Sequence, residues 1–181
     1  ENLGYGLDAI GDVNADGKPD ILVGARGRLV LNPSLCPTYN HTPKGAARIL
    51  SGANLSTWLL TINRTNRNTG FGYDAVAPAD YNSDGIKDMV IPAPYDGQNG
   101  GDPCDILSGS VLVYSGSNGS LLNSFAVVDA FATPVGTLGD INGDGIVDFA
   151  YYAYNGTVGR HFSLRSGANY SELATIPTTQ S

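Results

Sequence analysis

The sequence has few of the residues that nucleic acids, soft metal ions or membranes require of a protein. Its 181 residues include 10 lysines and arginines, 17 acidic residues, 2 histidines and 2 cysteines, which gives a net charge of −7. A phosphate backbone needs a basic stripe, so we expect no nucleic-acid partner. No apolar run approaches the ~20 residues of a membrane helix, so we expect no membrane span.

Recognisable sets of catalytic residues are also missing. No nucleophile and base, phosphate-binding loop or pair of general acid and general base stands out, because the clustered aspartates are better explained as metal ligands. We therefore expect that the protein is not an enzyme.

Glycine and proline, in contrast, are abundant. The 24 glycines and 10 prolines favour many tight turns between short strands, and they make long helices unexpected. The 41% of hydrophobic residues is enough to bury a core. Composition therefore indicates a globular, all-β chain.

Three units of the sequence align with one another. Each contains an acidic loop with the pattern Asp-x-Asn-x-Asp-Gly-x-x-Asp, then an apolar segment, and later a Ser-Gly-x-Asn turn. The acidic loops are 12–20, 80–88 and 140–148, and the Ser-Gly turns are 51–54, 115–118 and 166–169. We expect the repeats to span 1–69, 70–133 and 134–181.

Each unit offers four candidate strands, which are rich in Val, Ile, Leu, Tyr and Phe. In the second unit we expect them near 72–78, 88–92, 109–115 and 120–127. Repeated four-stranded antiparallel sheets are the blades of a β-propeller, which has ~4 to 8 of them. Three blades cannot close a ring, so the ring is expected to be incomplete within this chain.

The acidic loops have the donors and the spacing of a hard-cation site. Side chains at positions 1, 3 and 5 converge, glycine at position 6 permits a sharp turn, the carbonyl at position 7 adds an oxygen, and the aspartate at position 9 closes the cage. Carboxylate and amide oxygens in a flexible loop suit Ca²⁺, whereas Zn²⁺ prefers His or Cys. We expect about three Ca²⁺ ions, held by Asp12, Asn14, Asp16, Lys18, Asp20, Asp80, Asn82, Asp84, Ile86, Asp88, Asp140, Asn142, Asp144, Ile146 and Asp148.

Two other interpretations of the acidic loops compete with this one. An EF-hand needs glutamate at position 12, but Val23, Ile91 and Tyr151 stand there. Asn, Asp and Gly also form ordinary turns without a metal. Three loops in register favour the cation over the ordinary turn.

The repeats resemble the FG-GAP repeats of integrin alpha-subunit propellers. Phe71-Gly72 and Gly24-Ala25 stand where the family has its FG and GAP elements, while 92–94 matches less strictly. The third unit keeps the acidic loop but has Val135-Gly136 and Tyr152-Ala153 at those places. The resemblance implies calcium between the first two strands of each blade, on the face opposite the partner-binding loops.

Three functions agree with this resemblance. One is a calcium-binding extracellular subunit that assembles, as a fibre or multimeric surface structure, with other copies of itself. Another is an adhesion module cut from a longer chain with further repeats, whose loops 26–44 and 94–108 bind a protein or glycan. A weaker alternative is an accessory domain of a carbohydrate-active enzyme. All three place the protein outside the cell or on its surface.

Two kinds of covalent modification fit that location. Cys36 and Cys104 each lie 24 residues after the first aspartate of their loop, and a disulfide between them suits an oxidising compartment. Free or intermolecular thiols are the alternative. Asn-x-Ser/Thr sequons offer sites for glycosylation, unless these residues only form turns; they lie at Asn40, Asn54, Asn63, Asn118, Asn155 and Asn169.

Overall fold

The computed structural model describes residues 2–26, 45–64, 70–94, 109–127 and 133–178, which form three antiparallel β-sheets. Blade 1 has the strand order β1 (Asn2–Gly11), β2 (Asp20–Arg26), β3 (Ala46–Leu50) and β4 (Trp58–Asn63). Blade 2 consists of β5 (Met89–Ala93), β6 (Gly109–Tyr114) and β7 (Leu121–Val127). Blade 3 consists of β8 (Thr133–Gly139), β9 (Asp148–Asn155), β10 (Gly159–Arg165) and β11 (Glu172–Pro177).

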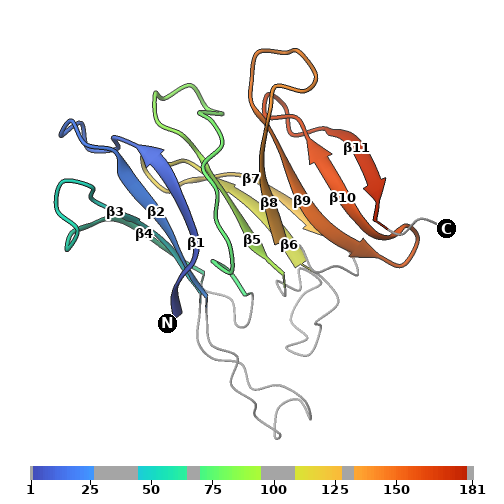
Figure 1. Cartoon of the computed structure of the whole chain (residues 1–181), viewed down its shortest axis with the longest axis horizontal. Helices are drawn as coiled ribbons and strands as arrows, with labels where there is room; N and C mark the ends of the chain where they lie inside the picture. The colour runs from blue at the N-terminus through green and yellow to red at the C-terminus, as the bar shows by residue number, and fades with distance from the viewer. Residues whose placement is uncertain (1, 27–44, 65–69, 95–108, 128–132, 179–181) are drawn as a thin grey trace, which may run out of the picture.

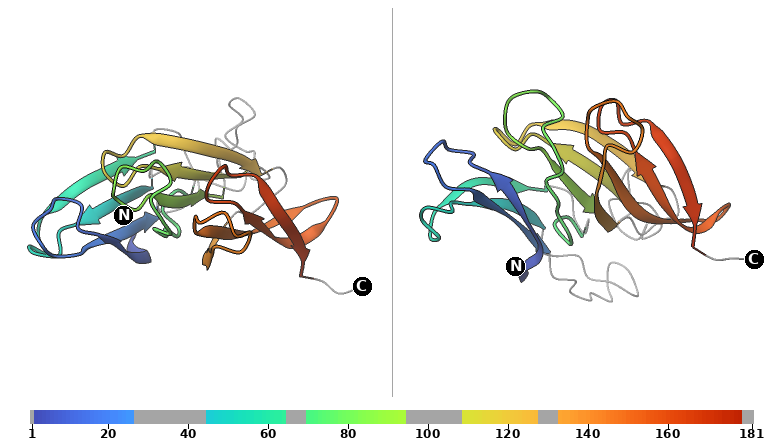
Figure 2. Two further views of the ribbon diagram at one scale, coloured as in Figure 1. Left: turned by 90° about the horizontal axis from the view of Figure 1, so that it is seen from above. Right: turned by 45° about the horizontal axis from the view of Figure 1, so that its top comes forward.

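Each sheet is an up-and-down meander in which strands that are consecutive in sequence are neighbours. The three sheets lie side by side in chain order (Figure 1), and the views of Figure 2 show them as an open arc. The all-β, blade-type fold predicted from the repeats is therefore confirmed. The described residues contain no helix, and so none that is long and apolar enough to cross a membrane.

A hydrophobic cluster joins blades 1 and 2. Alternate residues of a strand face opposite sides of its sheet, so β2 directs Leu22 toward blade 2 and β5 directs Met89 and Ile91 toward blade 1. These side chains are fully buried. The remaining fully buried members of the cluster include Ile10 and Ile49 of blade 1 and Phe71 and Ala93 of blade 2.

A second cluster joins blades 2 and 3 by the same alternation. Val90, which lies between the two β5 residues that face blade 1, packs with Phe149 and Tyr151 of β9. Val111 and Val113 of β6 complete the blade 2 side. Both faces of blade 2 are therefore buried, which explains why β5 and β6 are buried along their whole length.

The outer faces of blades 1 and 3 keep large apolar side chains exposed. On blade 1, Leu3 is 50% and Leu7 is 65% exposed, and these residues pair with Ala25 and Val23 on the side away from blade 2. On blade 3, Ile176 of β11 is 50% exposed and pairs with Phe162 of β10. In the other repeats, the equivalent positions are buried where one blade packs against the next.

The predicted strand 72–78 of the second unit is wrong, because this segment makes only one isolated bridge, between Val76 and Val90. Gly70 and Gly72 have φ values of 62° and 75°, which break the strand conformation.

The segment packs against blade 1 instead: a Cβ on Gly72 would lie 2.2 Å from the carbonyl oxygen of Ala46. Asp8 of β1 accepts the N–H of Ala77 at 2.9 Å. Blade 2 is thus a three-stranded sheet with a docked first segment.

Candidate metal centres

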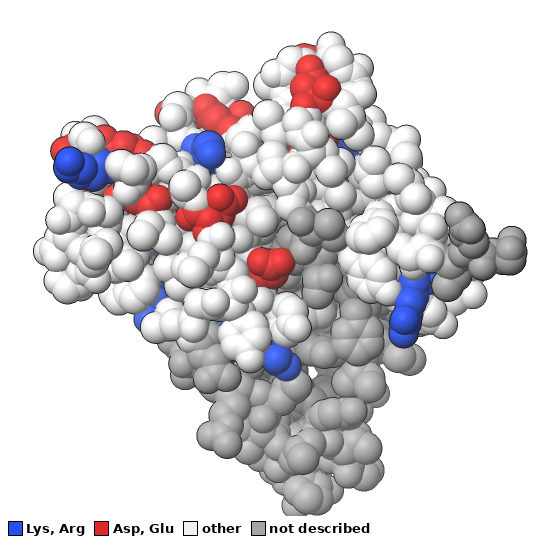
Figure 3. Space-filling view, in the orientation of Figure 1, with Lys and Arg blue, Asp and Glu red and all other residues white. Residues whose placement is uncertain are grey.

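All three acidic loops lie at the same end of their blades, shown at the top in Figure 1. Acidic side chains gather along that edge in the space-filling view (Figure 3). The first loop joins β1 to β2, the second precedes β5, and the third joins β8 to β9. The prediction that each loop lies between the first two segments of its blade agrees with this placement.

The aspartate at position 1 organises the backbone of each loop. In the second loop, Asp80 accepts the N–H of Asp84 at 3.1 Å and the N–H of Gly85 at 2.7 Å. The other two loops repeat this pair of bonds, Asp12 with Asp16 at 3.0 Å and Gly17 at 2.7 Å, and Asp140 with Asp144 at 3.0 Å and Gly145 at 2.8 Å. The chain therefore curls around the carboxylate of position 1.

Two positions in each loop have a left-handed backbone. Glycine occupies position 6 in every loop, with φ between 87° and 89° at Gly17, Gly85 and Gly145. Position 4 also has positive φ, 57° at Ala15, 62° at Ser83 and 79° at Gly143. The sequence pattern predicted the turn at position 6 and gave no sign of the one at position 4, because its residue type varies.

Position 3 and position 5 face each other within the loops. In the second loop, Asn82 accepts the N–H of Asp84 at 3.0 Å and donates its amide to the Asp84 carboxylate at 2.9 Å. Asn142 and Asp144 make the same two contacts at 3.0 and 2.7 Å. In the first loop, Asn14 accepts the N–H of Asp16 at 3.2 Å.

Position 7 contributes its N–H to the aspartate at position 5, at 3.0 Å in each loop. The donors are Lys18, Ile86 and Ile146. The predicted role of their carbonyl oxygens as ligands stays a prediction.

The aspartate at position 9 is buried and connects two turns of its blade. Asp20, Asp88 and Asp148 are at most 1% exposed. Asp88 accepts the N–H of Tyr81 in its own loop at 2.7 Å and the N–H of Gly116 in the Ser-Gly turn at 3.1 Å. Asp20 bonds Val13 and Gly52, and Asp148 bonds Ile141 and Gly167, in the same way.

Serines of the Ser-Gly turn also reach the acidic loop, which sequence reasoning did not foresee. Ser117 and Ser115 donate to Asp84 at 2.6 and 3.1 Å, and Ser166 donates to Asp144 at 3.1 Å. Ser51 of blade 1 instead accepts the N–H of Asn54 at 3.1 Å. The sequence feature that could have indicated these contacts is the recurrence of Ser-Gly at a fixed place in each unit.

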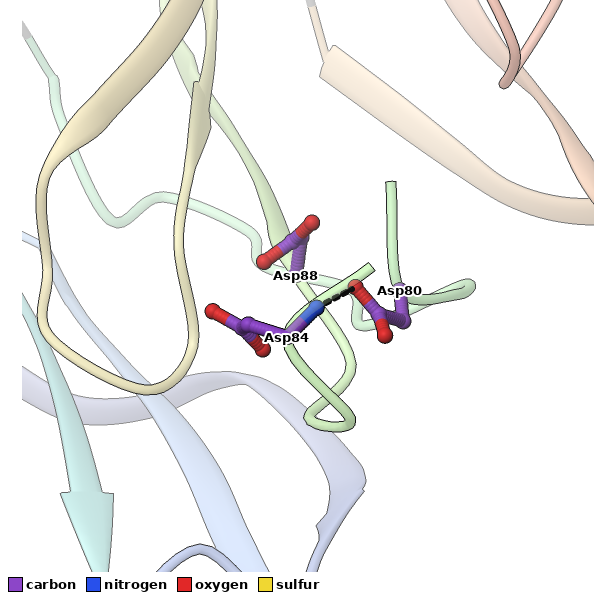
Figure 4. Close-up of side chains that lie close together, drawn as sticks. All are labelled: Asp80, Asp84 and Asp88. Carbon is purple, nitrogen blue, oxygen red and sulfur yellow. Dashed lines mark hydrogen bonds between the residues drawn. The ribbon is translucent and has the colours of Figure 1, made fainter. Parts of the chain in front are cut away.

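Carboxylate oxygens of Asp80, Asp84 and Asp88 all lie within 4.8 Å of one another. Figure 4 shows the three side chains close together, with the N–H of Asp84 bonded to the Asp80 carboxylate. Among the described residues of the chain, this is the one group of acidic, His or Cys side chains that meets as closely. The second loop is therefore the best-formed candidate for a cation site.

The electrostatics of this group favour a counter-charge. Burial raises the pKa of Asp88, and the nearby charges of Asp84 and Asp80 raise it further. A hydrogen bond from Ser117, together with bonds from Asn82, lowers the pKa of Asp84. In the third loop, a hydrogen bond from Asn142 lowers the pKa of Asp144. In the second loop, Asp84 is thus held as an anion beside the buried Asp88 carboxylate, and a divalent cation would relieve their repulsion.

Several predicted modification sites lie outside the described part of the chain. Cys36, Cys104 and Asn40 are outside the described residues, and so is the side chain of Asn155. Asn54, Asn118 and Asn169 are exposed on the three Ser-Gly turns, and Asn63 is exposed at the end of β4. The disulfide and the glycosylation of these sites stay predictions.

Comparison with known proteins identifies the repeats. The FG-GAP repeat model matches residues 4–34. The chain is 30% identical over 156 residues to integrin alpha-V of Gallus gallus, covering 83% of this chain and 14% of that protein. It is 35% identical over 107 residues to integrin alpha-6 of Homo sapiens, covering 56% of this chain and 9% of that protein. The chain thus corresponds to a small part of these relatives, and it belongs to the FG-GAP, integrin alpha-like family of β-propeller repeats.

Proposed function

We propose that the chain binds Ca²⁺ at its three acidic loops, with up to three ions in all. The observation that carries this proposal is the convergence of Asp80, Asp84 and Asp88 within 4.8 Å, in a loop whose pattern and hydrogen bonds recur twice more. The donors are all hard oxygens, and the described loops hold no His or Cys. Such a donor set fits Ca²⁺ and does not fit Zn²⁺.

Positions 1, 3, 5 and 9 would hold the ion, and position 7 would add its carbonyl oxygen. When bound, the ion supplies charge neutralisation and no redox or acid–base chemistry. Hydrogen bonds of the loop residues extend this stabilisation to the rest of the blade. Because the position 9 aspartate already bonds the Ser-Gly turn, fixing it also fixes the far hairpin of the same blade. The site therefore stiffens a blade and takes no part in catalysis.

The blades form part of a larger propeller in this proposal, with repeat limits at 1–69, 70–133 and 134–181. The support is that the outer faces of blades 1 and 3 expose the apolar positions that are buried between the blades inside the chain, such as Leu7 and Ile176. Further repeats of a longer chain would cover them. The protein then acts extracellularly as an adhesion-type or ligand-binding scaffold. A protein or glycan would bind at the loops 26–44 and 94–108, which apart from Arg26 and Pro94 lie outside the described residues.

Assembly with other copies is the second candidate, and one observation favours it over further FG-GAP repeats at blade 3. In blade 1, Gly24 and Gly45 leave room for the Phe71-Gly72 segment of the next blade, since Cβ atoms there would lie 2.7 and 1.7 Å from its carbonyl oxygens. In blade 3 the position equivalent to Gly24, counted from the acidic loop, holds Tyr152. The position equivalent to Gly45, counted from the Ser-Gly turn, holds Arg160. A following blade would have to pack its first segment there differently, as blade 3 does on blade 2, where Pro92 stands at the Gly24 position.

Thermal unfolding with calcium and with a chelator tests the cation proposal. At free calcium about 100 times the dissociation constant, one site adds about 2.7 kcal/mol to the free energy of unfolding. Asp84→Asn is expected to remove the contribution of the second loop. Asp74→Asn, which changes an acidic residue outside the loops, is the matched control and is expected to keep the full calcium response. An unfolding temperature that does not change with chelator would refute the proposal.

A further inference from the structure

We propose that a cation bound in one acidic loop also fastens that blade to the next one, through the side chain at position 2 of the loop. This inference rests on the proposed calcium function and goes beyond the stiffening of a single blade. The residue concerned is Tyr81 in the second loop, and its counterparts are Val13 and Ile141.

Tyr81 belongs to blade 2 and its ring packs against blade 3. The ring centroid lies 6.0 Å from that of Phe149 and 5.8 Å from that of Tyr170, the latter in an edge-to-face arrangement. A Cβ added to Gly167 would lie 2.6 Å from the Tyr81 ring. The ring therefore fills the space between the second acidic loop and the Ser-Gly turn of blade 3.

The backbone of Tyr81 is held by a predicted cation ligand. Its N–H donates to Asp88 at 2.7 Å, and Asp88 is fully buried. The cation, the Asp88 carboxylate, the Tyr81 backbone and the Tyr81 ring thus form a continuous path from the loop to blade 3. No other polar contact explains the position of the ring, because the buried Tyr81 hydroxyl has no hydrogen-bond partner among the described residues.

The other two loops repeat this backbone bond, and they differ in whether a further blade packs beside them. Val13 donates its N–H to Asp20 at 2.8 Å and packs against the cluster that joins blades 1 and 2. Ile141 donates its N–H to Asp148 at 2.9 Å, but the described residues place no blade beyond blade 3, and Ile141 is 50% exposed. Position 2 is therefore partly buried where a next blade is present, at Val13 and Tyr81, and exposed at Ile141, where the described residues place none.

Because coupling between two binding free energies is reciprocal, the effect of the ion on the contact between blades 2 and 3 can be measured. If the ion strengthens the contact between blades 2 and 3, that contact must strengthen the affinity of the second loop for the ion by the same factor. Changing a side chain on blade 3 should then weaken calcium binding on blade 2, although that side chain is no ligand.

The experiment measures Ca²⁺ affinity by titration calorimetry in the full chain, with the first and third loops silenced by Asp16→Asn and Asp144→Asn. Tyr170→Asn removes the blade 3 ring and keeps a residue type that tolerates the left-handed φ of 64°. Tyr81→Ser removes the ring on blade 2, and Tyr81→Phe retains it. Ile141→Ser makes a similar change at position 2 of the silenced third loop, so it controls for a nonspecific effect of such a substitution on the chain.

Calcium affinity is expected to fall at least about fivefold in Tyr170→Asn and Tyr81→Ser, because fivefold is the lower end of typical coupling between sites. It is expected to stay unchanged in Tyr81→Phe and Ile141→Ser. Amide exchange of residues 149–153 should be slowed by calcium in the parent, in Tyr81→Phe and in Ile141→Ser, and should not be slowed in Tyr170→Asn or Tyr81→Ser. Binding with equal affinity and equal exchange in all variants would overturn this inference and leave the proposed function intact. A parent that binds no calcium would overturn the proposed function itself.

Discussion

Gly116→Ala is expected to separate the Ser-Gly turn of blade 2 from its acidic loop. A Cβ at this position would lie 2.0 Å from the carbonyl oxygen of Lys87 and 3.1 Å from Cδ1 of Ile10. Real side chains do not approach a backbone oxygen so closely, so the turn must move. That movement also breaks the 3.1 Å bond from the Gly116 N–H to the buried Asp88.

The two effects add to a large loss of stability. Overpacking of a close contact costs about 1–3 kcal/mol. Loss of a hydrogen bond to a buried carboxylate costs about 1.5–3 kcal/mol more. We therefore expect Gly116→Ala to lower the free energy of unfolding by about 2.5–6 kcal/mol, measured by urea unfolding in saturating calcium, and to weaken calcium binding in the second loop.

Gly143→Ala is the matched control. Gly143 has φ of 79°, and a Cβ there meets nothing within 4 Å. Ala15 and Ser83 already occupy the equivalent position with positive φ. The control should cost about 0.5–1 kcal/mol, which is the left-handed backbone strain less the unfolded-chain entropy that alanine removes. A Gly116→Ala variant as stable as Gly143→Ala would refute the docking of the turn onto the loop.

Three further predictions concern single side chains. Tyr81→Phe removes a buried hydroxyl that has no hydrogen-bond partner among the described residues. It should therefore raise the free energy of unfolding, measured in urea, by about 1 kcal/mol. A decrease of that size would mean that the hydroxyl is hydrogen-bonded. Ser83→Gly relieves φ of 62° and should raise the calcium-saturated melting temperature, with a net gain of about 0.5 kcal/mol after the entropy cost of glycine. Gly24→Ala places a Cβ 2.7 Å from the Gly72 carbonyl oxygen and should cost about 1–3 kcal/mol in thermal unfolding; no cost would show that the first segment of blade 2 is not docked there.

The sequence predicted the blades well, because the spacing of its acidic loops and turns is tied to local backbone needs. Glycine at position 6 and aspartates at positions 1, 5 and 9 each have a role that one loop explains by itself. The strand at 72–78 was predicted wrongly because its apolar residues fit a strand equally well. Only the positive φ of Gly70 and Gly72, set by contact with blade 1, decides against it.

Contacts made outside a single loop were the part that the loop pattern could not indicate. Position 9 was expected only as a ligand, yet Asp88 also holds Gly116 across the blade. Tyr81 reads as an arbitrary residue within the loop pattern, and its packing on Tyr170 depends on the arrangement of two blades. Such features arise from the packing of turns within a blade and of one blade on the next, which sequence spacing does not specify.

Direct calcium titration of the unmodified full chain, with the number of bound ions counted by calorimetry, tests the cation sites most directly. We expect saturable binding that approaches three ions per chain at millimolar calcium, with one site lost in each of Asp16→Asn, Asp84→Asn and Asp144→Asn. The absence of saturable binding at millimolar calcium would contradict the assignment of the acidic loops as cation sites.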